Sequence, residues 1–237
     1  SLAERLIRSL WYGLVVRLER RAVRRCRDGR TLAVSEELAD LLSRYHGVPR
    51  EGITVCENGV DHAVFRPDPH DPARARLRAE LGLGDGHVLA LFLGGLWLEK
   101  GATYSIQALA QTDGCVHLCL AGRDDPAPFR ALAEQLGVAD RVHFLPATDQ
   151  PHEYYHAADL MLFPGHAEGF GLVAVEAAAC GLPVLMTRVG VAERLIEDGV
   201  SGFLIVQEPT EIAERLNALA REAGLRERMG EAAVAAA

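Results

Sequence analysis

Short runs of apolar residues alternate along this chain with longer stretches whose apolar positions follow a helical period. Most of the short runs are continuously apolar, which is typical of strands buried on both faces of a sheet. They predict strands at residues 31–35, 53–56, 88–93, 116–121, 142–145, 159–163, 183–187 and 203–206.

The longer stretches predict helices at residues 36–46, 72–82, 101–111, 127–137, 150–158, 170–180, 209–221 and 225–236. Regular alternation of strands and helices predicts an α/β fold, with a Rossmann-like parallel sheet and helices on both of its faces. Ligands of such sheets bind at the carboxyl ends of the strands, so we expect functional residues in the loops that follow strands.

The first thirty residues form a separate amphipathic pattern. Leucines recur every four residues from Leu2 to Leu18 and, with Trp11, predict the apolar face of a helix over residues 2–27. Residues 1–30 hold nine arginines against three acidic residues, a net charge of +6, whereas 16 basic and 30 acidic residues leave the remainder at −14. The helix either packs at a domain interface or makes peripheral contact with anionic lipid at the inner face of a membrane. Nucleic acid is not an expected partner, because the acidic remainder would repel phosphate.

Length and composition favour a cytoplasmic protein. The chain has 237 residues, of which 49% are hydrophobic and 24% charged, as in ordinary globular proteins. The longest uncharged apolar run, residues 88–98, is too short to cross a bilayer, and no secretory signal opens the chain. The five cysteines form no C-x-x-C pair and have apolar neighbours, so we expect reduced core residues. The chain begins inside a helical pattern and ends without a stop signal, so we expect both ends to be truncated.

Two glycine-containing turns follow predicted strands. Residues 94–101 combine two glycines with Lys100, the single lysine of a chain that has 24 arginines. A compact ammonium group at a helix start is suited to a phosphate. Residues 58–61 read Asn-Gly-Val-Asp, a turn sequence.

A third loop places two glycines where a loop becomes a helix. Gly169 and Gly171 lie between Glu168 and Glu176, and the predicted helix starts beside them. The first N–H groups of a helix are unpaired and lie at the positive end of its dipole, so this turn suits an anionic ligand.

The order of these segments resembles the carboxyl-terminal half of the retaining GT-B glycosyltransferases, of the glycosyl transferases group 1 or family 4 type. That family has an N-G-V-D turn with a following Phe-x-Pro, then G-R-L-x-x-E-K-G, then E-G-F-G-L-x-x-x-E with A-x-A-x-G-x-P-V, and finally D-G-x-x-G-x-L-V. This chain has matching segments in the same order at residues 57–67, 94–101, 168–184 and 198–205. The resemblance covers nearly the whole chain.

The resemblance implies two parts. Residues 1–66 would be the end of an amino-terminal, acceptor-side domain with the interdomain linker, and residues 67–237 a Rossmann-like domain that binds the nucleotide-sugar. Asn58 and Gly59 would form the interdomain hinge. The implied reaction transfers a hexose with retention from a nucleotide-diphosphate-sugar to a sugar, lipid or other small acceptor, with no cofactor and no metal. Because the missing domain would hold the acceptor, we expect the fragment alone to be inactive.

The family's roles fall on three side chains. Lys100 would neutralise the diphosphate and stabilise it as it leaves, Glu168 would face the donor sugar, and Glu176 would accept hydrogen bonds from the ribose. Lys100 and Glu168 are therefore the candidate catalytic residues. The remaining predicted donor-binding residues act through the backbone: Gly94, Gly95, Gly169, Phe170, Gly171 and Leu172.

One departure from the family pattern weakens the prediction of catalysis. Gly95 stands where the family usually has an arginine that shares the phosphate charge with the lysine. A catalytically inactive GT-B nucleotide-binding module therefore stays open as an alternative. Residues 121–125 replace a glycine-rich turn of the family, and no role is assigned to them.

Other motifs suggest different chemistry. Residues 152–156 read H-E-x-x-H, which either binds zinc, as in a protease, or belongs to a polar surface around Tyr154 and Tyr155. Residues 169–174 read G-x-G-x-x-A, a dinucleotide turn, but the loop before it is longer than that turn requires. A zinc protease, an NAD-dependent enzyme and a nucleotide-sugar epimerase are thus the less favoured interpretations.

Overall fold

The computed structural model describes residues 2–25 and 31–237, and the chain divides into two compact units, Ser1–Asn58 and Gly59–Ala237. The first unit contains α1 (Leu2–Arg25), β1 (Thr31–Ala33), α2 (Glu36–His46), the 3-10 turn η1 (Arg50–Gly52) and β2 (Ile53–Val55). Strands β1 and β2 pair in parallel, and α2 packs against both of them. The Ser35 hydroxyl caps α2 by accepting the N–H of Leu38.

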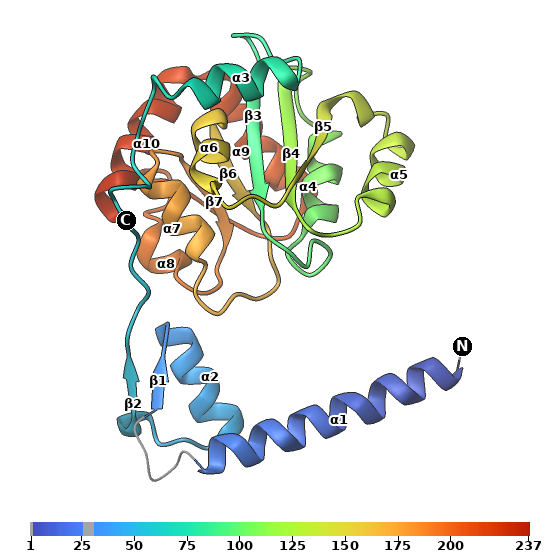
Figure 1. Cartoon of the computed structure of the whole chain (residues 1–237), viewed down its shortest axis with the longest axis vertical. Helices are drawn as coiled ribbons and strands as arrows, with labels where there is room; N and C mark the ends of the chain where they lie inside the picture. The colour runs from blue at the N-terminus through green and yellow to red at the C-terminus, as the bar shows by residue number, and fades with distance from the viewer. Residues whose placement is uncertain (1, 26–30) are drawn as a thin grey trace. The chain divides into compact units, whose positions relative to one another are not determined.

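The second unit is built on a six-stranded parallel sheet (Figure 1). Its strands are β3 (Val88–Leu93), β4 (Val116–Gly122), β5 (Val142–Pro146), β6 (Leu160–Phe163), β7 (Val184–Thr187) and β8 (Gly202–Ile205). They lie in the order β5-β4-β3-β6-β7-β8. From β3 the next strands in sequence, β4 and β5, are added on one side, and from β6 the next strands, β7 and β8, are added on the other side. The boundary between β3 and β6 is the switch point of the sheet, beside which ligands of such folds bind.

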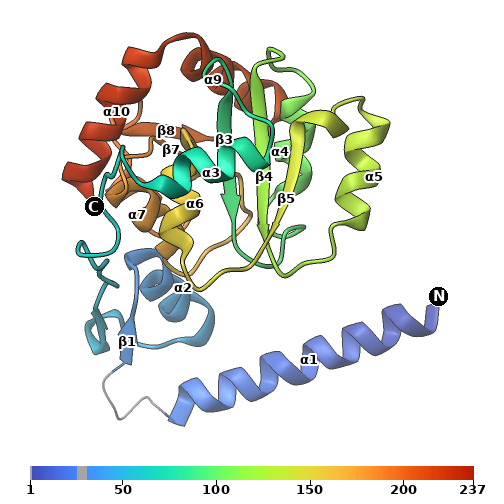
Figure 2. The ribbon, with the colours of Figure 1, turned by 45° about the horizontal axis from the view of Figure 1, so that its top comes forward.

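Helices cover both faces of this sheet (Figure 2). They are α3 (Pro72–Glu80), α4 (Ala102–Leu109), α5 (Ala127–Gln135), α6 (Pro151–Ala157), α7 (Leu172–Ala179), α8 (Ala192–Leu195), α9 (Pro209–Arg221) and α10 (Ala223–Ala236), with the 3-10 turn η2 (Ala139–Arg141) before β5. On one face α4 packs against α5 and α9, and on the other α3 packs against α6. Helix α7 packs against β6, β7 and α10.

The main core lies between the sheet and the layer of α4, α5 and α9. Alternate residues of β3 (Val88, Ala90 and Phe92) are buried in it, as the two-residue period of a strand requires. The other residues of this strand are buried as well, since helices cover the opposite face. Continuous burial explains why the strand reads as an uninterrupted apolar run.

The predicted α/β fold is confirmed. All eight predicted strands and all eight predicted helices after the first helix occur within the described residues, with small shifts at their ends. The first helix is confirmed over Leu2–Arg25, while positions 26 and 27 of its predicted range lie outside the described residues. Helix α8 was not predicted, because a single turn is too short to show a period.

The boundary between the units differs from the predicted one. It falls after Asn58, whereas the sequence places it after residue 66. Two contacts explain the difference: the Phe65 ring lies edge-on to Tyr155, with 6.1 Å between centroids, and the Arg66 carbonyl is 2.9 Å from Nε2 of His156. The linker from Gly59 onward is therefore packed against α6 as part of the second unit.

Candidate functional site

Two predicted catalytic side chains meet across the switch point of the sheet. Lys100 follows β3 and Glu168 follows β6, and the Lys100 ammonium forms an ion pair with Oε2 of Glu168. The ammonium also lies 5.2 Å from the centroid of the Phe163 ring, at the end of β6. Both side chains are partly open to solvent, 22% and 18% exposed, so an anion arriving from solvent can reach the lysine.

Direct backbone packing brings these two loops together. Gly101 has a φ of 87°, and a Cβ at this position would lie 2.1 Å from the Pro164 carbonyl oxygen. Only glycine satisfies both conditions. The N–H of His166 donates to the carbonyl of Glu99 at 3.2 Å, which links the loops again. The position of Lys100 opposite Glu168 therefore follows from the backbone of both loops.

The turn that contains Gly94 and Gly95 is held by a side chain from the loop that follows β4. The Asp124 carboxylate accepts the N–H groups of Leu96 and Trp97, both at 3.0 Å. The indole of Trp97 is buried and donates to the Gly94 carbonyl at 2.8 Å. Asp124 lies in the segment 121–125 that sequence reasoning left without a role, and its structural role is to fix the lysine loop.

Helix α7 starts at the third predicted loop without a side-chain cap. Its N-cap is Gly171, with a φ of 99°, and among residues 2–25 and 31–237 no side chain caps the first N–H groups of the helix. Phe170 is buried, and its carbonyl accepts the N–H of Val191 at 2.7 Å, so the loop after β7 supports this turn. Leu172 is exposed at the first turn. Uncapped N–H groups at the positive end of a helix dipole are a binding site for a phosphate group.

Glu176 is one side chain whose partner the sequence did not reveal. Its Oε2 accepts the hydroxyl of Tyr155 at 2.8 Å. Burial raises the pKa of Glu176, and the hydrogen bond from Tyr155 partly offsets this by favouring the charged carboxylate. The two residues lie far apart in sequence, on α7 and α6, so no local spacing pattern could have indicated the pair.

The H-E-x-x-H motif does not form a zinc site. Nδ1 of His156 contacts the Asp71 carboxylate and Nε2 donates to the Arg66 carbonyl, so both ring nitrogens are occupied. Tyr154 and Tyr155 are buried, 8% and 0% exposed, so the polar surface expected around them is wrong. Their apolar rings face the core of the unit, as aromatic rings usually do. Within residues 2–25 and 31–237, no group of three or more His, Cys, Asp or Glu side chains is arranged to hold a metal ion.

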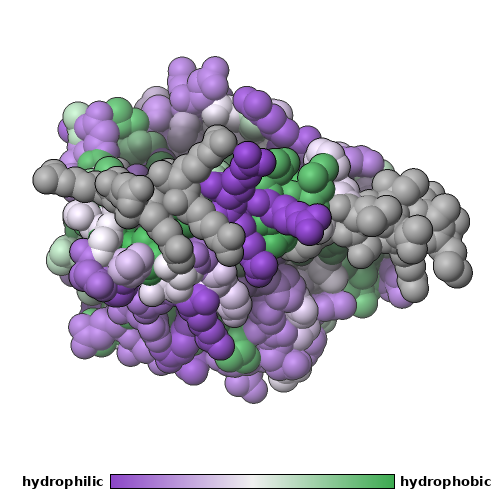
Figure 3. Space-filling model, turned by 90° about the horizontal axis from the view of Figure 1, so that it is seen from below, coloured by the Kyte–Doolittle hydropathy of each residue, from purple (hydrophilic) through white to green (hydrophobic). Residues whose placement is uncertain are grey.

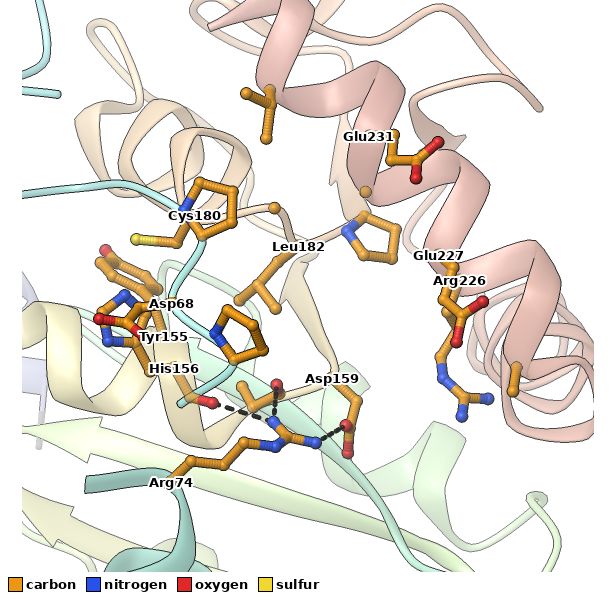
Figure 4. A pocket seen from close by; sticks show the side chains of 18 residues that line it. Asp68, Arg74, Tyr155, His156, Asp159, Cys180, Leu182, Arg226, Glu227 and Glu231 are labelled. Carbon is orange, nitrogen blue, oxygen red and sulfur yellow. Dashed lines mark hydrogen bonds and ion pairs between the residues drawn. The ribbon is translucent and has the colours of Figure 1, made fainter. Parts of the chain in front are cut away.

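A cavity of about 730 Å³ lies at the opposite edge of the sheet, where α6 and α7 end and β6 and β7 begin (Figure 4). Arg74 and Asp159 form an ion pair in its wall, and Arg226, Glu227 and Glu231 line it from α10. The predicted donor-binding residues do not line this cavity. Tyr155 links the cavity to the predicted donor site, because it lines the cavity and its hydroxyl donates to Glu176.

The predicted hinge coincides with the division of the chain, since the first unit ends at Asn58 and the second begins at Gly59. Bending at these residues stays a prediction. Cys115, Cys119 and Cys180 are free thiols at buried or half-buried positions, but Cys56 is exposed, so its predicted place in a core is wrong. Cys26 lies outside the described residues.

The apolar face predicted for α1 is described from Trp11 onward. Trp11, Leu14 and Leu18 are exposed, and so are Arg17 and Arg20. Figure 3 shows a face of the molecule on which hydrophilic side chains lie close to hydrophobic ones. Among the described residues, no helix combines the length and the apolar character that crossing a membrane requires.

Sequence comparison identifies the family. The family described as Glycosyl transferases group 1 matches residues 73–235, and Glycosyltransferase Family 4 matches residues 3–64. The first match spans more than half of the chain. This chain therefore belongs to the glycosyl transferases group 1, and the predicted resemblance to the carboxyl-terminal half of GT-B glycosyltransferases is confirmed.

Among curated relatives, the D-inositol 3-phosphate glycosyltransferase of Xylanimonas cellulosilytica is 38% identical over 219 residues, covering 88% of this chain and 52% of the relative. The protein of the same name from Acidothermus cellulolyticus is 37% identical, covering 86% and 47%. This chain thus spans about half the length of the curated relatives that it matches.

Solved structures share the fold. Alr3699/HepE of Anabaena, in complex with UDP and glucose, matches with a TM-score of 0.84 and 27% identity, over 93% of this chain and 61% of its own. WaaG, a glycosyltransferase involved in lipopolysaccharide biosynthesis, matches with a TM-score of 0.76 and 28% identity, over 86% and 57%. The fold is therefore GT-B type.

Proposed function

We propose that this chain is the donor-binding half of a glycosyltransferase that transfers a hexose from a nucleotide-diphosphate-sugar. The observation that supports this most is the pairing of Lys100 with Glu168 across the switch point, beside the uncapped start of α7. The family match and the UDP bound to the Anabaena protein support the choice of donor.

In the proposed reaction the donor diphosphate replaces Glu168 as the partner of Lys100. The ammonium and the N–H groups at the start of α7 would stabilise the negative charge that develops on the leaving diphosphate, without a metal ion. Glu168, released from the lysine, would accept a hydroxyl of the donor sugar, and Glu176 would accept hydroxyls of the ribose. We propose retention of configuration on the basis of the family resemblance.

The acceptor would be held by a further domain. Relatives named D-inositol 3-phosphate glycosyltransferase suggest a phosphorylated polyol or sugar as the acceptor class. We therefore expect residues 1–237 to bind a nucleoside diphosphate and to transfer little or no sugar. A thermal-shift screen with UDP, GDP and ADP tests binding, and sugar transfer at the rate of a complete enzyme by this fragment would contradict the proposal.

A nucleotide-binding module without catalysis is the second candidate, and Gly95 favours it because no side chain there can share the phosphate charge with Lys100. Lys100→Ala and Glu176→Ala in the complete protein separate the two. An enzyme should lose about a hundredfold or more in rate with Lys100→Ala, whereas a module without catalysis would have no transferase rate to lose. Arg228→Ala, which removes an exposed cation from α10, is the control and should leave the rate unchanged.

For α1 the two interpretations predict different binding. A peripheral location at the inner face of a membrane requires the protein to sediment with vesicles that contain anionic phospholipid, and to lose this on Trp11→Ser or Arg17→Ser. Packing of the helix within a longer protein predicts no sedimentation with such vesicles. The exposed Trp11 and Leu18 are compatible with either.

A further inference from the structure

Tyr155, on α6, contacts a side chain of the proposed donor site, Glu176 on α7. Its ring is fully buried and is held edge-on by Phe65. Its hydroxyl donates to Oε2 of Glu176 at 2.8 Å. Glu176 itself is only partly buried.

This hydrogen bond has a fixed direction. Burial and the neighbouring Glu176 charge raise the pKa of Tyr155 well above its ordinary value, so the hydroxyl keeps its proton and acts as the donor. Cys180, at the C-cap of α7, stays a neutral thiol because burial raises its pKa to about 12. Glu176 is therefore the acceptor, and one of its oxygens is occupied by the protein.

An anchored carboxylate has consequences for a ligand. Fixing Oε2 restricts rotation of the side chain and leaves Oε1 to accept hydrogen bonds from outside. The same bond favours the charged form of a carboxyl group whose pKa burial raises. A carboxylate that is held in one orientation and kept charged binds a pair of adjacent hydroxyls better than a mobile or protonated one.

We propose that Tyr155 is a positioning residue for ribose recognition, which acts by orienting Glu176 and keeping it ionised. The inference rests on the proposed function, in which Glu176 accepts the ribose hydroxyls. It predicts that Tyr155 affects the binding of nucleosides but not that of the diphosphate group, because the latter is assigned to Lys100 and the start of α7.

Tyr154 offers a matched control on the same helix. It is also buried, and its hydroxyl donates to the Pro146 carbonyl at 3.1 Å, away from α7. Tyr154→Phe and Tyr155→Phe each remove one buried hydroxyl and retain the ring. Any general effect of losing such a hydroxyl should therefore appear in both variants.

The experiment measures affinity by calorimetry for inorganic pyrophosphate and for UDP, GDP or ADP, whichever the unchanged chain binds most tightly. We expect Tyr155→Phe to weaken nucleoside diphosphate binding about tenfold or more, the loss of one hydrogen bond to a charged group, and to leave pyrophosphate binding unchanged. Tyr154→Phe should change neither. The nucleotide affinity of Tyr155→Phe should also begin to fall at a higher pH on acidification, since Glu176 has lost the bond that favours its charge.

Glu176→Gln completes the test, because a carboxamide does not titrate near neutral pH. In this background Tyr155→Phe should not shift the pH profile. If Glu176→Ala leaves nucleotide affinity unchanged, the ribose role in the proposed function is wrong. If Glu176→Ala weakens binding but Tyr155→Phe does not, or if Tyr154→Phe weakens it equally, the inference about Tyr155 alone is overturned.

Discussion

Two ion pairs lie at opposite edges of the same sheet, and they differ in how they are connected. At the amino-terminal edge, Asp159 accepts Arg74, Arg78 and the N–H of Leu89 at 2.8 Å each. At the carboxyl edge, Glu168 pairs with Lys100 and also accepts the N–H of Gly169 at 3.1 Å, and the Lys100 ammonium lies beside the ring of Phe163. Exposure of the acidic side chain barely separates the two, at 12% for Asp159 and 18% for Glu168.

The two ion pairs differ in how many further hydrogen bonds their basic side chains make. Arg74 also donates to the carbonyls that end α6, and Arg78 to carbonyls of the loop before β3. Burial would raise the pKa of Asp159, but its hydrogen bond with Arg74 and the charge of Arg78 hold the pKa below the ordinary value. The network around Asp159 therefore joins α3 to the end of α6 and to the loop before β3. Lys100, in contrast, can exchange its partner without breaking contacts between these elements. We infer that the first pair stabilises the fold and the second is kept for a ligand.

The strongest test of this contrast removes the shared carboxylate. Asp159→Ala should lower the free energy of unfolding by about 3–5 kcal/mol, because it leaves two guanidinium groups without their anion. Urea denaturation of the chain measures the effect. An effect below that of an ordinary surface substitution would show that the network does not stabilise the fold. Asp149→Ala, at an exposed position, is the control.

The carboxyl edge should depend on its backbone more than on its charges. Gly101→Ala places a methyl group against the Pro164 carbonyl at a positive φ, so we expect a loss of about 2–3 kcal/mol and a displaced Lys100. Gly114→Ala is a suitable comparison, since its Cβ would meet nothing within 4 Å. Equal stability of the two variants in thermal denaturation would contradict the close packing of the loops.

At the amino-terminal edge of the sheet, falling pH should lower the free energy of unfolding first through protonation of a histidine, His117, and only at lower pH through protonation of Asp159. Burial, with the charges of His143 and His87, lowers the pKa of His117 from 6.5 to about 4. The unfolded chain therefore binds this proton first, and stability falls as the pH drops from 6.5 towards 4, by at most about 3 kcal/mol. Asp159, with its lowered pKa, loses its contribution only below 3.8. His117→Phe should flatten the dependence between pH 6.5 and 4 in urea titrations, and an unchanged slope would contradict the assignment.

The smallest expected effect completes the contrast. Lys100→Ala should change the free energy of unfolding by no more than about 1 kcal/mol, as removal of partly exposed ion pairs usually does. The same variant is expected to abolish most nucleotide binding. A large loss of stability in thermal denaturation would show that the Lys100–Glu168 pair stabilises the fold, as the Asp159 pair does, and is not kept for a ligand.

The central strands of the second unit were predictable because both of their faces are buried, which leaves a continuous apolar run such as residues 88–93. The lysine and glutamate loops could be placed at one edge because parallel strands all end there. Their contact could not be predicted, since it depends on the strand order that brings β3 beside β6.

Hydrogen-bond partners that lie on different helices, strands or loops could not be predicted from the sequence. Asp124 holds the turn at Leu96 from the loop after the neighbouring strand β4, and Tyr155 holds Glu176 from a neighbouring helix. The histidines of the H-E-x-x-H motif have the spacing of zinc ligands, yet His156 is committed to Asp71 and Arg66. Spacing along a helix shows which side chains share a face, but not which groups lie opposite them.

The division at Asn58 has a consequence for how such proteins can be recombined. The contacts described for Lys100, Glu168 and Glu176 are all made by residues after Gly59. A gene fusion at this junction could therefore exchange the preceding segment for that of another family member without altering any partner of these three side chains. Under the proposed function, the donor site would then be inherited independently of the preceding segment.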